Sequence, residues 1–347
     1  MAERVIERRW ESTTRVSRAV RSVLTPASWL YGAVVAARNR AYDTGLLRSH
    51  DLGLPTVSVG NLTVGGTGKT PIASWMASRV AAHGARPAIL LRGYGGDEVL
   101  VHRLLTPQAI VVAGADRVAA AIRARSEGAT VCVLDDGFQH RRVRRDADIV
   151  LVSADRHREV RLLPAGPWRE PLASLRRASH VIVTRKRTTP MHAREVMAYV
   201  GRVAPHAEVS MADLVADSIV RWGGHERAST DALAGQVILA VSAIGDPRAF
   251  ESQLSALGAR VAARVFPDHH AFSAREVEEL AYEATGARFM LCTLKDAVKL
   301  GPVWPASAPP LWYLSQRVSI ESGLKGLEEL ARRLAVTAHP TDDLIAG

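Results

Sequence analysis

A glycine-rich loop directly after an apolar run is the segment of this chain best suited to chemistry. The apolar run covers residues 56–59, and the loop that begins at Gly60 ends in Gly68-Lys69-Thr70 before a stretch with helical character. Glycines let backbone N–H groups close around an anion, and a helix N-terminus adds partial positive charge. In such loops a lysine contacts the outer phosphates of a nucleotide, and a threonine hydroxyl contacts Mg²⁺. The sequence therefore predicts a nucleotide site made of Gly65, Gly66, Thr67, Gly68, Lys69 and Thr70.

Two adjacent carboxylates follow another apolar run. Residues 131–134 predict a buried strand, and Asp135 and Asp136 come directly after it. An enzyme with a phosphate-binding loop needs an acid at a neighbouring strand end to hold Mg²⁺. The same segment continues to Gln139 and His140, and His140 could contact a substrate or orient a carboxylate.

Both segments also have purely structural interpretations. Thr63 stands where a strict P-loop has glycine, so the loop is a variant, and a glycine-rich turn without a ligand would share its pattern. Paired aspartates are also common at the start of loops. Together, the loop and the acidic pair favour a nucleotide bound with Mg²⁺.

Two further segments could supply proton chemistry. Residues 92–98 follow the second predicted strand and end in Asp97 and Glu98, which fall near the phosphates; a kinase needs such a group to accept a hydroxyl proton. Asp268 and His269 end a strand of the second half. A metal site there is disfavoured, because adjacent residues of an extended segment point in opposite directions and no further His/Cys cluster occurs. A histidine hydrogen-bonded to a carboxylate across a cleft is the better interpretation.

The elements that must position these residues alternate between strand and helix. In the first half, strands are predicted at residues 56–59, 88–91, 109–113, 131–134, 149–152 and 181–184, and helices at 70–83, 116–126 and 191–200. In the second half, strands are predicted at 236–241, 261–266 and 288–293, with helices starting at Asp246 and Ser273 and a last helix at 321–334. Such alternation predicts an α/β fold: a P-loop-like, mostly parallel sheet with helices on both faces, and a second, smaller α/β domain.

The predicted boundaries give an N-terminal arm at 1–45, a P-loop domain at 46–216 and the smaller domain at 217–347. Residues 188–216 are the expected bridge, and the last helix could pack back on the first domain. Ligands of parallel sheets bind beyond the carboxyl ends of the strands, where the glycine loop falls.

The net charge of +10 on 347 residues predicts an anionic partner. We expect no nucleic acid partner, since no known binding module occurs and aromatic residues are few. Cys132 and Cys292 lie in apolar runs and are expected to be inert core thiols in a reducing compartment.

The N-terminal arm has an apolar stretch at residues 27–37 with arginine-rich flanks. It comes too late in the chain for a signal peptide and is too short to span a bilayer, which takes about 20 apolar residues. A helix on an anionic membrane surface and a helix packed on the domain are both consistent with this pattern.

In their order along the chain, these segments resemble the tetraacyldisaccharide 4′-kinase family, the lipid A 4′-kinases of Gram-negative bacteria. Ser28-Trp29-Leu30-Tyr31-Gly32 resembles the N-terminal arm of that family. The other matching motifs are residues 59–71, 92–95, 96–98, 135–140, 163–170, 268–269 and 295–299. The resemblance covers nearly the whole chain, and an ordered set of motifs is far more specific than a P-loop alone.

The resemblance implies transfer of the ATP γ-phosphate to the 4′-hydroxyl of a tetraacylated glucosamine disaccharide 1-phosphate, with Mg²⁺. It assigns Asp97 as catalytic base paired with His269, with Asp268 steering the ring and Glu98 as the alternative base. Thr70, Asp135 and Asp136 would serve the metal. Candidate substrate contacts are Asn61, Arg92, Gln139, His140, Arg169 and Glu170.

Because acyl chains leave a bilayer only at a cost of roughly 0.8 kcal/mol per CH₂, the resemblance favours an arm anchored on the membrane. It implies a peripheral protein on the cytoplasmic face of the inner membrane, with no obligate protein partner evident. Two alternatives remain: an ATP-dependent enzyme acting on a soluble acceptor, and a membrane-associated nucleotide switch without an acceptor.

Overall fold

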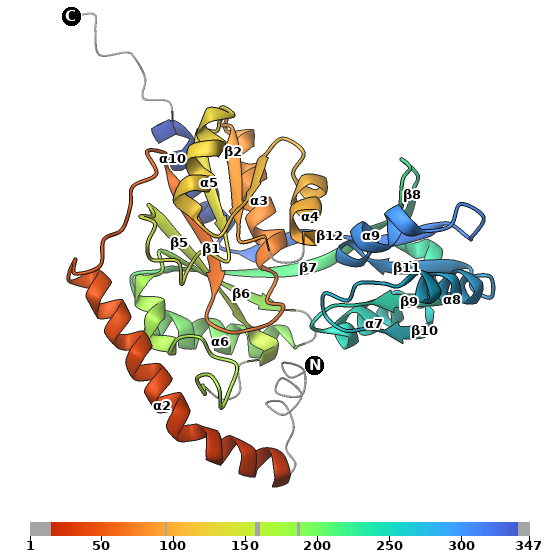
Figure 1. The fold of residues 1–347 in the computed structure, drawn as a ribbon, viewed down its shortest axis with the longest axis horizontal. Helices are drawn as coiled ribbons and strands as arrows, with labels where there is room; N and C mark the ends of the chain where they lie inside the picture. Colours follow the sequence, from red (N-terminus) through yellow and green to blue (C-terminus); the bar gives the residue numbers. More distant parts are fainter. Residues whose placement is uncertain (1–14, 94–95, 157–159, 186–187, 339–347) are drawn as a thin grey trace, which may run out of the picture.

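A computed structural model describes residues 15–93, 96–156, 160–185 and 188–338. Tyr94 and Gly95 of the predicted 92–98 segment lie outside the described residues, as do residues 1–14 of the arm. The strands form one 12-stranded sheet in the order β10-β9-β11-β12-β7-β6-β5-β1-β4-β2-β3, and β8 pairs with β7. Figure 1 shows the long strands β7 and β12 running from the larger lobe, at the left, into the smaller one.

The larger lobe holds six parallel strands, and β7 pairs parallel with the last of them, β6. Their bounds are β1 Thr56–Asn61, β2 Pro87–Leu91, β3 Ile110–Ala113, β4 Val131–Asp135, β5 Ala147–Ser153 and β6 His180–Arg185. β1, β2 and β4 are buried throughout. β2 and β4 read as apolar runs because both faces of the sheet are covered.

Helices cover the two faces of this lobe with different residues of the same strands. Helices α3 Lys69–Ala82 and α10 Leu324–Ala338 pack on one face, against Val57, Val59 and Ile89. Helix α5 Arg117–Ser126 packs on the opposite face against Ala88 and Leu90, and α6 Pro190–Val203 covers β5 and β6 there. The predicted α/β class, a mostly parallel sheet with helices on both faces, is confirmed.

The smaller lobe repeats this arrangement around three parallel strands, β9 Val237–Ser242, β10 Arg260–Val265 and β11 Phe289–Thr293. Helix α7 Pro247–Ala256 packs through Phe250 and Leu254 on one face. Helix α8 Ala274–Ala284 and the short helix α9 Leu294–Leu300 pack on the other.

The structure differs from the predicted elements at the junction of the two lobes. Strands β7 Glu208–Arg221 and β12 Leu311–Ser322 were not predicted, and they pair antiparallel along most of their length. Strand β8 Arg227–Ser229 was also missed. The predicted bridge, residues 188–216, contains α6 and much of β7.

The predicted start of the last helix was wrong. β12 continues to Ser322, Gly323 adopts a positive φ of 78°, and α10 begins only at Leu324. α10 then packs on α3, where Arg79 Nε lies 2.7 Å from Glu328 Oε1. The last helix therefore lies against the first lobe.

Candidate active site

The glycine loop lies at the carboxyl end of β1 and leads directly into α3. Gly65 and Gly68 have positive φ angles of 104° and 91°, and Gly68 is the residue before the first helical turn. Asn61 Nδ2 donates to Thr67 Oγ1 at 2.8 Å, and Lys69 Nζ donates to Asn61 Oδ1 at 3.4 Å. Asn61, the last residue of β1, therefore fixes Thr67 and Lys69 through its side-chain hydrogen bonds. Of the six residues predicted to bind phosphate, Gly65, Gly66, Thr67 and Gly68 lie in this loop, and Lys69 and Thr70 begin α3.

The acidic pair at the end of β4 faces the first residues of α3. Thr70 Oγ1 donates to Asp135 Oδ2 at 3.2 Å, while Lys69 Nζ lies 3.4 Å from Asp136 Oδ1. Arg169 Nη1 donates to both Asp136 oxygens at 3.0 Å. Burial acts to raise the pKa of Asp136, but the charges of Lys69 and Arg169 outweigh it and leave that pKa below its usual range.

The donor set fits Mg²⁺ better than a metal held by protein alone. No three carboxylate, histidine or cysteine side chains gather into a metal cage within the described ranges. Mg²⁺ commonly takes only one or two carboxylates and fills its remaining positions with water and phosphate oxygens. Asp135 Oδ1 is buried and has no hydrogen-bond partner among the described residues. A buried carboxylate oxygen in that state suits a cation.

His102 is a residue of this site that the sequence analysis missed. It lies on α4 Asp97–Leu105, is fully buried, and its Nε2 is 2.8 Å from Asp135 Oδ2. Its Nδ1 is 2.8 Å from Ser74 Oγ of α3. A lone histidine in an apolar stretch gives no sequence signal for such a contact.

Arg117 was also missed. It is 3% exposed at the start of α5, and burial lowers its pKa despite the nearby charges of Asp135 and Asp136. Arg92, a predicted substrate contact, is exposed at the end of β2 and adds to this effect through its own charge. The guanidinium groups of Arg92 and Arg117 therefore lie to one side of the acidic pair, near the ends of β2 and β3.

Asp97 is the first residue of α4, and Gly96 before it has a positive φ of 73°. His269, which also has a positive φ of 57°, places Nδ1 3.2 Å from Asp97 Oδ2. Burial acts to raise the pKa of Asp97, but the hydrogen bond and charge of His269, with Lys295 and Lys299, leave it below its usual range. The hydrogen bond to Asp97 raises the pKa of His269. Asp268 Oδ1 lies 3.9 Å from His269 Nε2.

The two adjacent histidines have different surroundings. His270 Nε2 lies 3.0 Å from Glu276 Oε1 of α8, and its ring stacks on Phe266 at 5.1 Å. His269 alone of the two pairs with Asp97. Glu98, the alternative base, lies 3.8 Å from Lys295, and burial raises its pKa.

The loops of the smaller lobe come close to the phosphate loop. A Cβ atom added to Gly245 would lie 3.3 Å from Asp268 Oδ2 and 4.0 Å from the backbone nitrogen of Gly66. The β9–α7 loop therefore lies against both the glycine loop of the larger lobe and the β10–α8 segment.

The remaining predicted substrate residues connect the site to the arm helix α2 Arg15–Asp43. Gln139 Nε2 donates to the carbonyl of Asn61 at 2.8 Å, and Arg38 donates to the Gln139 carbonyl at 2.9 Å. His140 keeps a low pKa of about 4 because of burial and nearby arginines. Glu170 is 2% exposed, and its carboxylate is bound by Asn39 and Arg177. This carboxylate therefore has a structural role.

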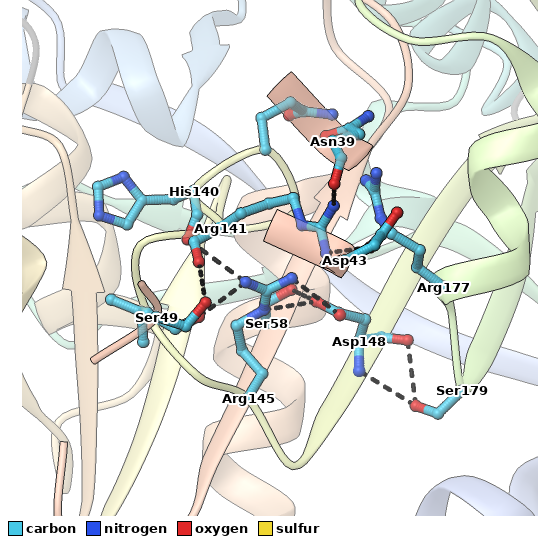
Figure 2. A network of polar contacts seen from close by, with 12 residues as sticks. Asn39, Asp43, Ser49, Ser58, His140, Arg141, Arg145, Asp148, Arg177 and Ser179 are labelled. Atoms are coloured by element: carbon cyan, nitrogen blue, oxygen red, sulfur yellow. Dashed lines mark hydrogen bonds and ion pairs between the residues drawn. The ribbon is translucent and has the colours of Figure 1, made fainter. Parts of the chain in front are cut away.

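Figure 2 shows how the loop after the acidic pair is fastened to the end of α2. Arg141 donates to the Asn39 carbonyl at 2.7 Å and to Asp43 Oδ1 at 2.6 Å. Arg145 in turn pairs with Asp148 of β5, 3.1 Å away. These bonds hold the segment that follows Asp136.

The arm lies along the larger lobe (Figure 1). Tyr31 donates to the Arg169 carbonyl at 3.0 Å, and Ser28 donates to the Leu162 carbonyl at the same distance. The opposite side of α2 exposes apolar side chains, namely Val23, Trp29, Leu30 and Val34. No helix in the described part of the chain is long and apolar enough to cross a membrane.

The fold and the loop together place this protein among the P-loop α/β nucleotide-binding proteins. Comparison with known proteins then gives the family. The family model for tetraacyldisaccharide-1-P 4′-kinase (LpxK) matches residues 20–108 and 95–334, so the chain belongs to this family.

Named relatives and a solved structure agree with this assignment. The chain is 38% identical to a tetraacyldisaccharide 4′-kinase from Anaeromyxobacter sp. strain Fw109-5, over 95% of both chains. It is 36% identical to the one from Halorhodospira halophila, over 86% of this chain and 89% of that protein. The crystal structure of LpxK from Aquifex aeolicus in complex with ATP is similar with a TM-score of 0.71 and 30% identity, covering 91% of this chain and 99% of the other.

Proposed function

We propose that this protein transfers the γ-phosphate of ATP to the 4′-hydroxyl of a tetraacylated glucosamine disaccharide 1-phosphate in lipid A biosynthesis. The observation that carries the proposal is the Asp97–His269 pair, whose side chains lie 3.2 Å apart. Asp97 begins α4, and His102 of the same helix contacts Asp135. Membership of the tetraacyldisaccharide-1-P 4′-kinase family supplies the acceptor.

The phosphate groups of ATP bind at the glycine loop. Backbone N–H groups of the glycine loop would bind the phosphates, and Lys69 would move from Asp136 and Asn61 to the outer phosphates. Thr70, Asp135 and Asp136 would hold Mg²⁺, which supplies positive charge against the developing charge of the transferred group. Arg169 keeps Asp136 ionised and fixed in place.

Asp97 accepts the proton of the acceptor hydroxyl. Because its pKa lies below the usual range, its carboxylate is ionised near neutral pH and available as an acceptor. His269 holds the carboxylate in position, and Asp268 lies on the far side of the ring. Glu98 stays engaged with Lys295 and is the second candidate for the base.

The acceptor reaches this site from a membrane surface. The exposed apolar side of α2 enters the interface, and its arginines meet anionic headgroups. We assign the contacts with the sugar and its 1-phosphate to Gln139, His140 and Arg169, on the side of α2, and to Arg92 at the end of β2. The protein acts as a peripheral enzyme on the cytoplasmic face of the inner membrane, without nucleic acid or an obligate protein partner.

We also propose two functional units in the chain, with the arm at 1–45 belonging to the first. Residues 46–216 bind the nucleotide, and residues 217–347 bring His269 to the site. The strands β7 and β12 connect the units, while α10 returns to the first.

The test is incubation of the protein with labelled ATP and the tetraacylated disaccharide 1-phosphate in detergent micelles, followed by chromatography of the lipid. The proposal expects a bisphosphorylated lipid that contains the label. Hydrolysis of ATP without labelled lipid would indicate a nucleotide switch. Labelling of a soluble acceptor in preference to the lipid would indicate a different kinase.

A further inference from the structure

The buried contact between His102 and Asp135 joins three elements of the site. Ser74 of α3, His102 of α4 and Asp135 of β4 lie in one chain of hydrogen bonds, with both distances 2.8 Å. All three side chains are buried. Because polar groups in such places are costly unless satisfied, the three side chains fix one another's rotamers.

The chemistry of the groups fixes the first link of this chain. A carboxylate oxygen accepts hydrogen bonds, so His102 Nε2 donates to Asp135 Oδ2. Nδ1 of the same ring pairs with the Ser74 hydroxyl, which can donate or accept. Thr70 Oγ1 donates to the same oxygen of Asp135 at 3.2 Å.

His102 and Thr70 therefore both donate to Oδ2 of Asp135, and neither donates to Oδ1. Asp135 Oδ1 is buried and has no hydrogen-bond partner in the described part of the chain. We propose that His102 is a positioning residue, which turns the Asp135 carboxylate so that Oδ1 is presented to the divalent cation of the bound nucleotide. Partners of this kind around metal-binding carboxylates typically change metal affinity by about 10- to 100-fold when they are removed.

The same contact ties the predicted base to the metal carboxylate. Asp97 begins the helix on which His102 lies, and α4 has only nine residues. The bond from His102 to Asp135 ties α4 to β4, and the bond from Asp97 to His269 ties the start of the same helix to the smaller lobe. Loss of the first bond removes a direct polar link between the helix that carries Asp97 and the strand that carries Asp135.

Two polar substitutions of similar size separate orientation from simple packing. In His102→Gln the side-chain amide reaches the position of Nε2 and can still donate to Asp135. In His102→Asn the amide reaches only the position of Nδ1 and contacts Ser74. Affinity for ATP is measured by isothermal titration calorimetry, with and without Mg²⁺, together with the melting temperature of each variant.

We expect Mg²⁺ to tighten ATP binding to the unsubstituted chain, and the ratio of the two affinities is the readout. We expect His102→Asn to reduce this ratio by about tenfold with little change in the affinity for metal-free ATP. His102→Gln keeps most of the ratio. If both variants melt at lower temperature but keep the ratio, His102 has only a packing role and the inference is wrong.

Ser74→Ala gives a second route if neither histidine variant folds. It leaves the ring in place but removes the group that orients Nδ1, so the Mg²⁺-dependent ratio should fall partly. An unchanged ratio in this variant would overturn the inference.

The inference rests on the proposed role of Asp135, and Asp135→Asn tells the two apart. If that variant keeps the full ratio, the metal role of Asp135 itself fails. If it loses the ratio while His102→Asn and Ser74→Ala keep it, only the role of His102 fails.

Discussion

The carboxylate of Asp97 lies 3.2 Å from Nδ1 of His269, although the two residues are 172 positions apart in the chain. They come from different lobes of one continuous sheet. Each changes the other's protonation: the pKa of Asp97 is lowered against the effect of burial, and the pKa of His269 is raised. This pair is therefore sensitive to any change that moves the lobes apart.

Removal of His269 should shift the acidic limb of the kcat/KM profile to higher pH. Burial is the largest influence on Asp97 and acts to raise its pKa, while His269 acts to lower it. In His269→Ala the burial effect remains and the opposing bond is lost, so Asp97 takes up a proton at higher pH than before. A pH–rate series on the two proteins measures the shift.

His270→Ala is the matched control for this experiment. Its side chain pairs with Glu276 and does not approach Asp97 in the described contacts. The acidic limb should stay in place in this variant. A shift of equal size in both variants would show that the limb belongs to a group other than Asp97.

Gly68→Ala should weaken ATP binding. Gly68 has a φ of 91°, where an L-residue costs about 1–2 kcal/mol, and a Cβ there would lie 3.1 Å from Leu214. The loop must shift to relieve both, so the amides no longer converge on the phosphates. We expect about a tenfold loss of affinity, measured by calorimetry.

Gly84→Ala provides the comparison for that loss. Gly84 has almost the same φ, 89°, at the other end of α3, and a Cβ there meets nothing within 4 Å. Both variants should lose stability, but only Gly68→Ala should bind ATP more weakly. If Gly68→Ala and Gly84→Ala bind ATP with the same affinity, the loop at Gly68 does not bind the phosphates.

The double substitution of Trp29 and Leu30 by serine should reduce binding to anionic vesicles. Both side chains are exposed, at 72% and 68%, on α2. Burial of one such side chain contributes about 1.5–3 kcal/mol, so we expect at least a tenfold loss of vesicle binding in a sedimentation assay. ATP affinity should remain as in the unsubstituted chain.

Tyr282→Ser removes an equally exposed aromatic side chain, at 80%, from α8 of the smaller lobe. It should leave vesicle binding unchanged. Equal losses in the two proteins would mean that general surface hydrophobicity, and not α2, drives the binding.

The sequence predicted the elements whose physical signal is local. Strands such as β1 and β4 are buried on both faces and therefore appear as short apolar runs. Strand β12 was missed because its apolar run covers only residues 311–314 and is followed by exposed polar residues, including Gln316 and Arg317. The helix α2 continues through Pro26 to Arg15, beyond the apolar stretch that signalled it.

The candidate site also has parts with a local sequence signal and parts without one. The glycine loop and the acidic pair were found because each lies within one short segment of the chain. The contact of His102 with Asp135 depends on how α4 packs against β4, which no local pattern encodes. The pairing of Asp97 with His269 was expected only through the family resemblance, since no spacing in the sequence relates the two segments.

The central claim is that Asp97 accepts the proton of the acceptor hydroxyl. Asp97→Asn keeps the size of the side chain and its place at the start of α4 but removes the base. In a single-turnover assay with ATP and the tetraacylated disaccharide 1-phosphate, we expect phosphoryl transfer to slow by about 10²- to 10⁴-fold, with ATP affinity retained. Transfer at the unsubstituted rate in this variant would contradict the account.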